Sequence, residues 1–598
     1  MRAVSPLNNA INLFQSGKTS QAAKILENFL DANPEDFDAL SLLGVILATS
    51  SELGAAIPLF ERATQIRPGD AEIHINLAVA YQEQGRFDEA IDHYRRSLSI
   101  EPNNEGCHTN LGNLLKDNND LTGAADCFNR ALAINPVNAW VHSNLGIVLE
   151  AQGLLDEAVA SHQRALEIDP DNALILSNLG IALKAQGLLD DAVGSHKRAL
   201  EIDSNIASIH NNLGFALAAQ DRLDEAVASY QKALAINPEY VEAHDNLGTA
   251  FDSLGKLDEA DTCFHKALAI NPHYAEAHRN LGHLQLLTGN FQDGWENINY
   301  RWLCNDSALS YQKYDKPLWR GEAIDGKSLL VWEEQGVGDR IIFASMIPDL
   351  IERGADIMIE CDKRLIPLYS RSFPAITCAA TNDPDIGKTE DKKFNLHAPL
   401  GDAGHWLRAD LASFPARTSY LVADSQQRHT LRNRYLERGN DFLVGIAWYS
   451  KSVHYGEQKS MTLLDLHPLL EMPGITFIDL QYGDTAEERK AFTTETGIEV
   501  FHDDGVDQMA DLDIFASQVA AMDLVVTISN TTAHMAGALG IPTLLMLGTL
   551  PIWYWLLKRD DSPWYPSLRL FRQQKRGDNW QEVVDLARHE LAARVGDS

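Results

Sequence analysis

The stretch NNEGCHTNLGNLLKDNNDLTGAADCFNRALAINP, residues 103–136, is one copy of a unit that recurs along the first half of this 598-residue chain. Its closing proline returns at positions 34, 68, 102, 136, 170, 238 and 272, and Ser204 fills the one vacant slot. The triplet Asn-Leu-Gly returns with the same spacing at 110, 144, 178, 212, 246 and 280. A fixed period of 34 residues predicts a solenoid of stacked repeats.

Apolar positions in the quoted unit predict two amphipathic helices. One face of the first helix carries Cys107, Leu111, Leu114 and Leu115, and one face of the second carries Leu121, Ala124, Ala125, Phe128 and Leu132. The polar run 118–120 supplies the turn between them, and Pro136 ends the second helix because proline cannot continue one. Gly112 removes a side chain where the two helices cross closely, which accounts for a glycine in a helix interior.

These features resemble the tetratricopeptide repeat. The resemblance rests on the period, the small residue of the Asn-Leu-Gly triplet, the alanine and phenylalanine positions of the second helix, and the closing proline. It covers residues 1–300 and implies an α-solenoid of about eight to nine helix pairs. Such a superhelix offers a groove to protein partners.

The composition describes a globular chain and excludes some functions. The 50 basic and 84 acidic residues give a formal charge of −34, so nucleic acid is not an expected partner. Six cysteines without C-x-x-C spacing predict reduced thiols. The start of the sequence lacks the apolar core of a signal peptide, and no uninterrupted apolar stretch reaches membrane-spanning length. We therefore expect a cytoplasmic protein with no membrane span.

Beyond the repeats the residue composition and the hydrophobic pattern of the sequence change twice. Residues 301–325 are rich in aromatic side chains and are expected to form a packed joint. Short β-rich runs then alternate with amphipathic stretches: SLLVWEE, ADIMIEC, FLVGIAW, ITFIDLQ, IEVFHD, DLVVTIS and TLLML. Strands that alternate with helices predict parallel sheets covered by helices. We interpret this half as an α/β fold of two Rossmann-like lobes, residues 326–425 and 426–598.

A polar cluster stands between a predicted strand and a predicted helix in VVTISNTTAHMAGALGIPT, residues 525–543. The join carries Ser529, Asn530, Thr531, Thr532 and His534. In open parallel sheets ligands bind at this end of a strand, and the free N–H groups and dipole of the following helix can hold a phosphate or diphosphate. The alternative is that Ser529 or Asn530 only caps the helix.

Two further segments follow predicted strands. In EEQGVGDRIIF, residues 333–343, Asp339 stands at a helix start, as a partner of the helix dipole or as a general base. In GIAWYSKSVHYGEQKSM, residues 445–461, Lys451 and Lys459 are the cations, and one of them could neutralise bound phosphates. The alternative for either lysine is an ordinary solvated side chain.

These segments together resemble bacterial heptosyltransferase-type glycosyltransferases of the GT-B fold. The resemblance rests on Gly338-Asp339, on Lys459 and on the run 530–534, which reads Asn-Thr-Thr-Ala-His. Adjacent threonines after a strand, combined with a repeat half, are also similar to the nucleocytoplasmic protein O-GlcNAc transferase.

The resemblance implies roles for these residues. Asp339 would be the catalytic base, and Lys459 would pair with the donor diphosphate. The donor site would be lined by Asn530, Thr531, Thr532 and His534. Heptosyltransferases usually carry aspartate where this chain has Asn530, so the identity of the donor, and whether turnover occurs, stay open.

The repeats carry two periodic lines of polar residues. One slot of the first helix holds Asn76, Asn110, Asn144, Asn178, Asn212, Asn246 and Asn280. A carboxamide both donates and accepts hydrogen bonds, so this ladder could hold the backbone of an extended peptide; alternatively each amide bonds within or between repeats. A second line holds His74, His108, His142, His210, His244 and His278, with Leu176 in the missing place. We interpret the histidines as packing between helices, in preference to metal binding or a pH switch.

The expected function draws on both halves. We expect a metal-independent, inverting glycosyltransferase that needs no cofactor and moves a sugar from a nucleotide sugar to a serine or threonine of a protein in the repeat groove. By analogy the acceptor would be flagellin or another surface protein. The alternatives are a non-catalytic scaffold that binds a nucleotide sugar, and a transferase that acts on lipid or polysaccharide. The sequence does not distinguish the donor sugar, its nucleotide, the acceptor or the oligomeric state.

Overall fold

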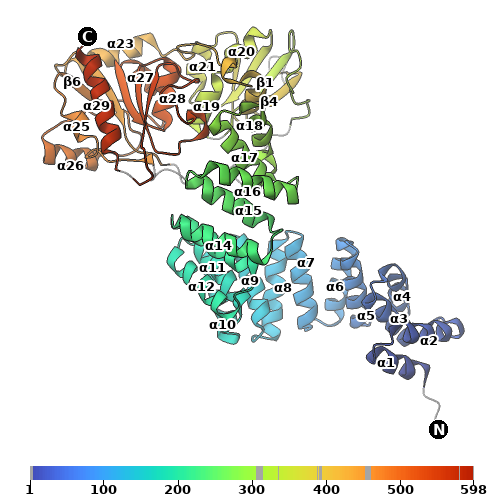
Figure 1. Ribbon diagram of the computed structural model, residues 1–598. Coiled ribbons are helices and arrows are strands. Elements are labelled where there is room, and N and C mark those ends of the chain that lie inside the picture. Colours follow the sequence, from blue (N-terminus) through green and yellow to red (C-terminus); the bar gives the residue numbers. More distant parts are fainter. Residues whose placement is uncertain are drawn as a thin grey trace. The chain divides into compact units, whose positions relative to one another are not determined.

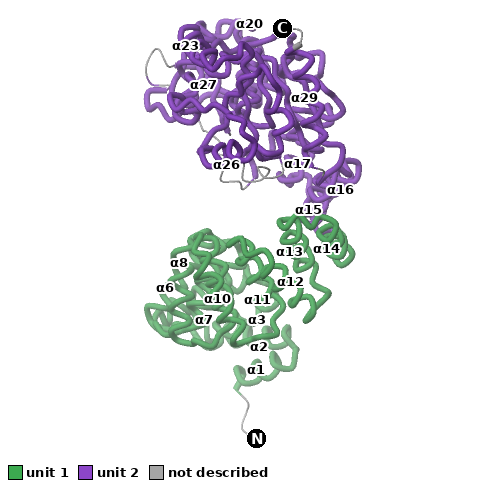
Figure 2. The backbone as a smooth tube through the Cα atoms, turned by 90° about the vertical axis from the view of Figure 1, so that its left-hand side faces the viewer, with its two compact units in different colours: residues 1–238 green, residues 239–598 purple. Residues whose placement is uncertain are grey.

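The computed structural model describes residues 5–304, 314–334, 336–386, 388, 393–451, 459–577 and 579–596. The chain divides into two compact units, residues 1–238 and 239–598, which Figure 2 colours separately. Tyr311 of the predicted joint lies outside the described residues.

The first unit consists of helix pairs (Figure 1). Its helices are α1 Pro6–Gln15, α2 Thr19–Ala32, α3 Phe37–Thr49, α4 Leu53–Ile66, α5 Ala71–Glu83, α6 Phe87–Ile100, α7 Glu105–Asp117, α8 Leu121–Ile134, α9 Ala139–Ala151, α10 Leu155–Ile168, α11 Ala173–Ala185, α12 Leu189–Ile202, α13 Ala207–Ala219 and α14 Leu223–Ile236. The predicted helix pair of residues 103–136 is confirmed as α7 and α8.

Local chemistry explains why each repeat folds in this way. The side chain of Asn104 accepts the N–H of Cys107 and so caps the start of α7. A Cβ atom on Gly112 would lie 2.7 Å from the ring of Phe128, so only glycine permits this crossing of α7 and α8. The glycine that the sequence predicted at a close helix crossing is therefore confirmed.

The second unit begins with the remaining repeat helices. They are α15 Val241–Ser253, α16 Leu257–Ile270, α17 Ala275–Thr288 and α18 Phe291–Ile298, followed by the 3₁₀ turn η1 Asn299–Leu303. Leu286, Phe291 and Trp295 are buried in the same apolar core as residues of the α/β region. The compact units therefore divide before residue 300, the predicted boundary, because the last repeats share a core with the α/β region.

Two parallel sheets form the rest of this unit, as the strand pattern predicted. The first has the order β3-β2-β1-β4, with β1 Ser328–Trp332, β2 Asp356–Cys361, β3 Thr377–Ala380 and β4 Leu396–Pro399. The second has the order β6-β5-β7-β8-β9, with β5 Phe442–Ala447, β6 Ile475–Asp479, β7 Leu524–Ile528, β8 Thr543–Leu547 and β9 Leu568–Arg572. The run IEVFHD, predicted as a strand, makes only an isolated bridge between Phe501 and Ile478.

Helices cover both faces of the second sheet, which explains its nearly continuous apolar strands. Alternate strand residues point to opposite faces: Val444 packs in one core with α29, and Leu443 packs in another with α27 and α28. The helices of this region are α19 Val337–Ala344, α20 Ile347–Glu352, α21 Ile366–Ser372, α22 Gly404–Leu407, α23 Ser425–Leu436, α25 His467–Leu470, α26 Ala486–Thr496, α27 Leu512–Ala520, α28 Thr531–Leu539 and α29 Gln581–Gly596. The 3₁₀ turns are η3 Gly401–Ala403, η4 Leu411–Ser413 and η5 Trp553–Trp555.

Candidate functional site

The order of strands locates one ligand position in each sheet. An open parallel sheet binds ligands beyond the carboxyl ends of its strands, at the point where the strand order reverses. In the second sheet the reversal lies between β5 and β7, because β6 lies on one side of β5 and β7 on the other. The segment after β7 is the polar run from Ser529 into α28.

In the first sheet the reversal lies between β1 and β4, and protein atoms occupy it. Arg301 of η1 donates to Glu334, beyond β1, through Nε at 2.9 Å and Nη2 at 2.7 Å. The same guanidinium bonds Asp402, beyond β4. Burial disfavours the charged guanidinium, yet these two carboxylates together raise the pKa of Arg301 above its ordinary value. The end of the repeats is thus tied to both strands of this reversal.

Asn530 forms the N-cap of α28 through one of its two polar side-chain atoms, and the cap does not use the other. Its Oδ1 accepts the N–H of Ala533 at 3.2 Å and the hydroxyl of Thr527 at 3.1 Å. The residue is only 6% exposed, and within the described part of the chain its Nδ2 has no hydrogen-bond partner. A buried donor without a partner costs free energy, so an acceptor supplied by a ligand would be stabilised here. The first-turn N–H groups and the positive end of the α28 dipole favour an anion at the same place.

The other predicted residues of this run are bonded inside the protein. The hydroxyl of Thr532 donates to the Leu480 carbonyl at 3.3 Å and is fully buried, whereas Thr531 is partly exposed. His534 is 2% exposed and meets the hydroxyl of Tyr565 through Nδ1 at 2.9 Å and that of Tyr554 through Nε2 at 3.3 Å. That Thr532 and His534 line a donor site stays a prediction. Any contribution they make to ligand binding would be indirect, through the Leu480 segment and the two tyrosines that they bond.

The imidazole of His534 is neutral near physiological pH. Burial and, to a smaller extent, the charge of the neighbouring Lys459 together lower its pKa to about 3. A neutral imidazole can accept from one tyrosine hydroxyl and donate to the other. His534 therefore orients Tyr554 and Tyr565 without adding a charge to the site.

Asp339 lies in the first turn of α19, where the structure places it against the other sheet's helix. Its carboxylate accepts the N–H of Gly336 at the start of the helix, a position that also suits the alternative role of a partner to the helix dipole. The segment also packs on α28: a Cβ atom on Gly338 would lie 2.9 Å from Cδ2 of His534. The structure thus brings together Asp339 and the start of α28, which are separated by almost two hundred residues of sequence.

The charges of Asp339 and Lys459 affect one another. Burial raises the pKa of Asp339 to about 6, against the opposing influence of the Gly336 N–H and of Lys459. Burial lowers the pKa of Lys459, and Asp339 opposes that shift. Of the two lysines considered from the sequence, Lys459 is therefore the one beside Asp339. A carboxylate with a pKa near 6 can accept a proton from a bound group and release it again at neutral pH.

Tyr554 and Tyr565 belong to the site, and sequence reasoning did not find them. Tyr554, in η5, is close enough to Asp339 for the carboxylate to raise its pKa, although burial contributes more. Ser529, next to the cap of α28, has the opposite influence on that pKa, and its hydroxyl oxygen accepts the indole N–H of Trp555 at 2.9 Å. The available signal was the aromatic density of PIWYWLLKRDDSPWYP, residues 551–566.

The seven predicted peptide-binding asparagines are all partly exposed. At four positions the Nδ2 group donates to the preceding repeat: Asn144 to Asn113 at 3.0 Å, Asn178 to Ser143 at 3.1 Å, Asn212 to Ser177 at 3.2 Å and Asn280 to Asp245 at 3.0 Å. The bonding between repeats that we considered as the alternative is thus present. A carboxamide has two N–H groups and a carbonyl, so one such bond does not use its full capacity. Peptide binding by the ladder stays a prediction.

The histidine line packs as expected. In five repeats Nε2 contacts the carbonyl oxygen six residues earlier: His74 with Pro68 at 3.1 Å, His108 with Pro102 at 2.9 Å, His142 with Pro136 at 3.0 Å, His210 with Ser204 at 3.0 Å and His278 with Pro272 at 3.0 Å. These bonds tie the start of each first helix to the turn that precedes it. The packing interpretation is confirmed.

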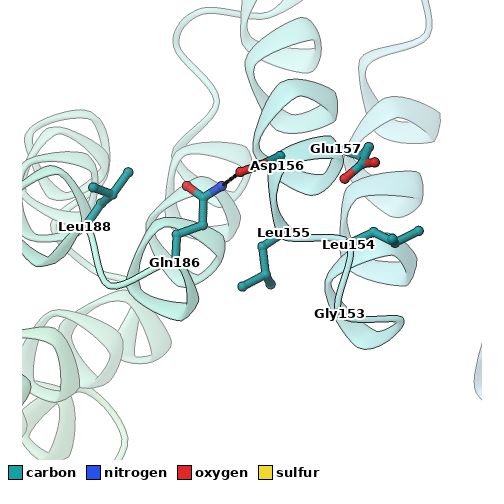
Figure 3. Close-up of a pocket in the computed structure, with 7 residues that line it drawn as sticks. All are labelled: Gly153, Leu154, Leu155, Asp156, Glu157, Gln186 and Leu188. Carbon is teal, nitrogen blue, oxygen red and sulfur yellow. Dashed lines mark hydrogen bonds between the residues drawn. The ribbon is translucent and has the colours of Figure 1, made fainter.

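A hollow of about 510 Å³ lies between the turns of two successive repeats (Figure 3). Leu154 and Leu188 line it together with Asp156, which accepts a hydrogen bond from Gln186 at 2.7 Å. None of the predicted site residues is among its lining residues.

Comparisons with known proteins identify the repeats. Tetratricopeptide-repeat family models match residues 7–71, 71–104, 112–153, 137–205 and 205–273, so the chain carries tetratricopeptide repeats. Protein FlbA of Caulobacter vibrioides is 32% identical over 309 residues, which cover 49% of this chain and 51% of that protein. The chain thus spans about half the length of this curated relative.

Solved structures also resemble part of the chain. MamA is 25% identical, with 28% of this chain and 97% of that chain covered and a TM-score of 0.25. YrrB, described as a tetratricopeptide-repeat protein with an unusual peptide-binding site, is 23% identical, with 31% and 95% covered and a TM-score of 0.25. Among the described residues of the present chain, no helix combines the length and apolar character needed to cross a membrane.

Proposed function

We propose that this chain is a metal-independent, inverting glycosyltransferase that moves a sugar from a nucleotide sugar to a serine or threonine hydroxyl of a protein acceptor. The observation that carries the proposal is the meeting of Asp339 with the start of α28, where Asn530 holds a buried amide donor without a partner in the described part of the chain. A base and an anion-binding position beside each other are the two groups that such a transfer requires.

Each of these groups would have one part in the reaction. The acceptor hydroxyl gives its proton to a carboxylate oxygen of Asp339 while its oxygen forms a bond to the anomeric carbon of the sugar. The bond from that carbon to the diphosphate oxygen breaks, and the nucleoside diphosphate leaves with the electron pair. The Nδ2 group of Asn530, the first-turn amides of α28 and the Lys459 ammonium stabilise the negative charge that develops on the leaving group.

The repeats would supply the acceptor. Tetratricopeptide repeats are present, and a protein segment held along the asparagine ladder would reach the site at a high effective concentration. Weak binding of the acceptor by the α/β region would then be sufficient.

A non-catalytic scaffold is the second candidate, and two observations favour it. The carboxylate of Asp339 already caps its own helix, and four ladder asparagines already bond the preceding repeat. In this reading the nucleotide sugar is bound without turnover. A transferase for lipid or polysaccharide is the alternative within the enzyme class.

Asp339→Asn separates these functions with little structural change. Asparagine can still accept the Gly336 N–H, but it cannot take up the acceptor proton. We expect intact-mass measurement of proteins co-purified with the wild-type chain to reveal a sugar adduct that is missing with D339N, while calorimetry shows nucleotide binding retained. The exposed Glu487→Gln serves as a matched control and should leave the adduct in place.

Two outcomes would decide against protein glycosylation. A wild-type chain that binds nucleotide but produces no adduct on any protein supports the scaffold. An adduct found on lipid or polysaccharide, and lost with D339N, supports the other transferase.

A further inference from the structure

Two aromatic side chains meet on the loops beside the proposed diphosphate position. Tyr449 comes after β5, and Tyr482 comes after β6, the neighbouring strand of the same sheet. Their ring centroids lie 5.8 Å apart with an interplanar angle of 34°, and both residues are partly exposed. The pair therefore lies at the carboxyl edge of the sheet, where ligands bind.

Buried bonds fix the backbone that carries these rings. The side-chain oxygen of Gln481, which is fully buried, accepts the N–H groups of Trp448 and Tyr449, each at 2.9 Å. The hydroxyl of Tyr482 accepts the N–H of Lys451 at 2.7 Å. The two loops are thus joined to each other, so the rings are held in place before any ligand arrives.

Gly483 brings the cation of this region close to the aromatic pair. Its φ is +89°, and a Cβ atom there would lie 2.9 Å from Nζ of Lys451 and 3.1 Å from the hydroxyl oxygen of Tyr449. Any larger residue would be strained in backbone and would displace the ammonium. The geometry therefore sets a positive charge directly beside the rings.

The aromatic pair and the start of α28 are connected through one short segment. The hydroxyl of Thr532, in the first turn of α28, bonds the Leu480 carbonyl, two residues before Tyr482. An anion at the first turn of α28 would thus lie beside the segment that carries a ring and holds the cation. An anion position, a cation and an aromatic surface along one edge of the sheet match the parts of a nucleoside diphosphate.

We propose that Tyr449 and Tyr482 are the platform for the nucleobase of a nucleoside diphosphate whose phosphates lie at the start of α28, with Lys451 as the cation between them. This inference rests on the proposed function. It adds that the nucleoside lies against the loops that follow β5 and β6. Stacking on an aromatic ring is tolerant of base identity, so the platform supplies affinity and other groups select the base.

Calorimetry of the full-length chain tests the platform. The probes are uridine, adenosine, guanosine and cytidine 5′-diphosphate and inorganic pyrophosphate, which lacks the nucleoside. We expect at least one nucleoside diphosphate to bind the wild type more tightly than pyrophosphate does. Tyr449→Leu and Tyr482→Leu should each weaken that binding about tenfold and leave pyrophosphate affinity unchanged. Tyr482→Phe keeps the ring and loses only the bond to the Lys451 N–H, so it should retain most of the affinity that Tyr482→Leu loses.

Each other outcome has a defined meaning. Unchanged nucleotide affinity in both leucine variants overturns the platform and leaves the proposed function standing. Equal loss of nucleotide and pyrophosphate binding also overturns it, because the tyrosines would then only support the loops. A wild-type chain that binds none of the five probes overturns the platform and the proposed function together.

Discussion

The two parallel sheets differ in what occupies the point where their strand order reverses. Between β1 and β4 the guanidinium of Arg301 bonds Glu334 and Asp402, and every participant comes from the protein. Between β5 and β7 the segment after β7 presents Asn530, whose buried Nδ2 lacks a partner in the described residues. The same topology is thus used differently in the two sheets. One strand reversal holds the end of the repeats, and the other keeps a buried donor that our proposal assigns to a ligand.

The largest expected effect comes from removing the guanidinium that occupies the point where the strand order of the first sheet reverses. Arg301→Met leaves Glu334, which is 3% exposed, as a buried charge without its partner. We expect a loss of about 3–5 kcal/mol in the free energy of unfolding, measured by urea denaturation of the whole chain. The double variant R301M/E334M should lose less, because the uncompensated charge is gone as well.

An exposed ion pair provides the control for this prediction. Arg67→Met removes the partner of Asp38, where both side chains are more than half exposed, and should cost about 0–1 kcal/mol. Equal losses in the free energy of unfolding for R301M and R67M would show that the ion pairs of Arg301 do not stabilise the strand reversal of the first sheet.

Changing the orphan donor tests the other reversal. Asn530→Asp keeps an acceptor for the Ala533 N–H, so the cap of α28 and the melting temperature should be retained. It replaces the Nδ2 donor by a negative charge, so pyrophosphate should bind about tenfold more weakly. A variant that binds pyrophosphate as the wild type does would mean that this amide does not face the anion.

The pH dependence of sugar transfer tests the same proposed site, at the strand reversal of the second sheet. Because the pKa of Asp339 is about 6, the rate should fall as the pH drops through that value, where the carboxylate becomes protonated. Lys459 favours the carboxylate, so Lys459→Met should raise the pKa of Asp339 and move the midpoint of this fall to higher pH. A midpoint that stays in place or moves to lower pH would show that Lys459 does not stabilise the charged form of Asp339.

The last prediction concerns amides that are partly bonded within the protein, where the expected change in acceptor capture is the smallest. Asn178 and Asn212 donate to Ser143 and Ser177. The variant N178A/N212A and the variant S143A/S177A both remove these two bonds, at a cost of about 0.5–1.5 kcal/mol per bond. The serine variant also loses the 3.4 Å contacts of Ser143 with His162 and of Ser177 with His196. If the ladder also holds a peptide, only the asparagine variant should weaken acceptor capture in a pull-down with the identified acceptor. Equal effects on capture would assign the ladder to stability alone.

The repeats were predictable because each unit solves the same local problem. The cap of Asn104, the contact of Gly112 with Phe128 and the closing proline act within one 34-residue period, and the period shows them many times over. The sheets were less predictable: β3, β4 and β9 were not recognised, and IEVFHD has strand composition but only a single bridge.

The site was predictable only where a local signal existed. Asp339 and the run 530–534 each stand between a strand and a helix, so both could be singled out. The partners that define the geometry are distant in sequence: Tyr554 reaches Asp339 and His534, and Arg301 reaches Asp402, through tertiary packing alone. No local pattern encodes such contacts, and the residue type does not reveal that Nδ2 of Asn530 lacks a hydrogen-bond partner within the described ranges of the chain.

The shared core of α17, α18 and the sheets has a practical consequence for dissecting the chain. A fragment that starts at residue 301 would lack Leu286, Phe291 and Trp295, and the surfaces they cover would face water. A fragment that starts at Glu239 retains them and coincides with a compact unit. Limited proteolysis should accordingly release a stable piece whose first residues are those of the last repeats, and soluble expression of the α/β region should depend on carrying these helices along.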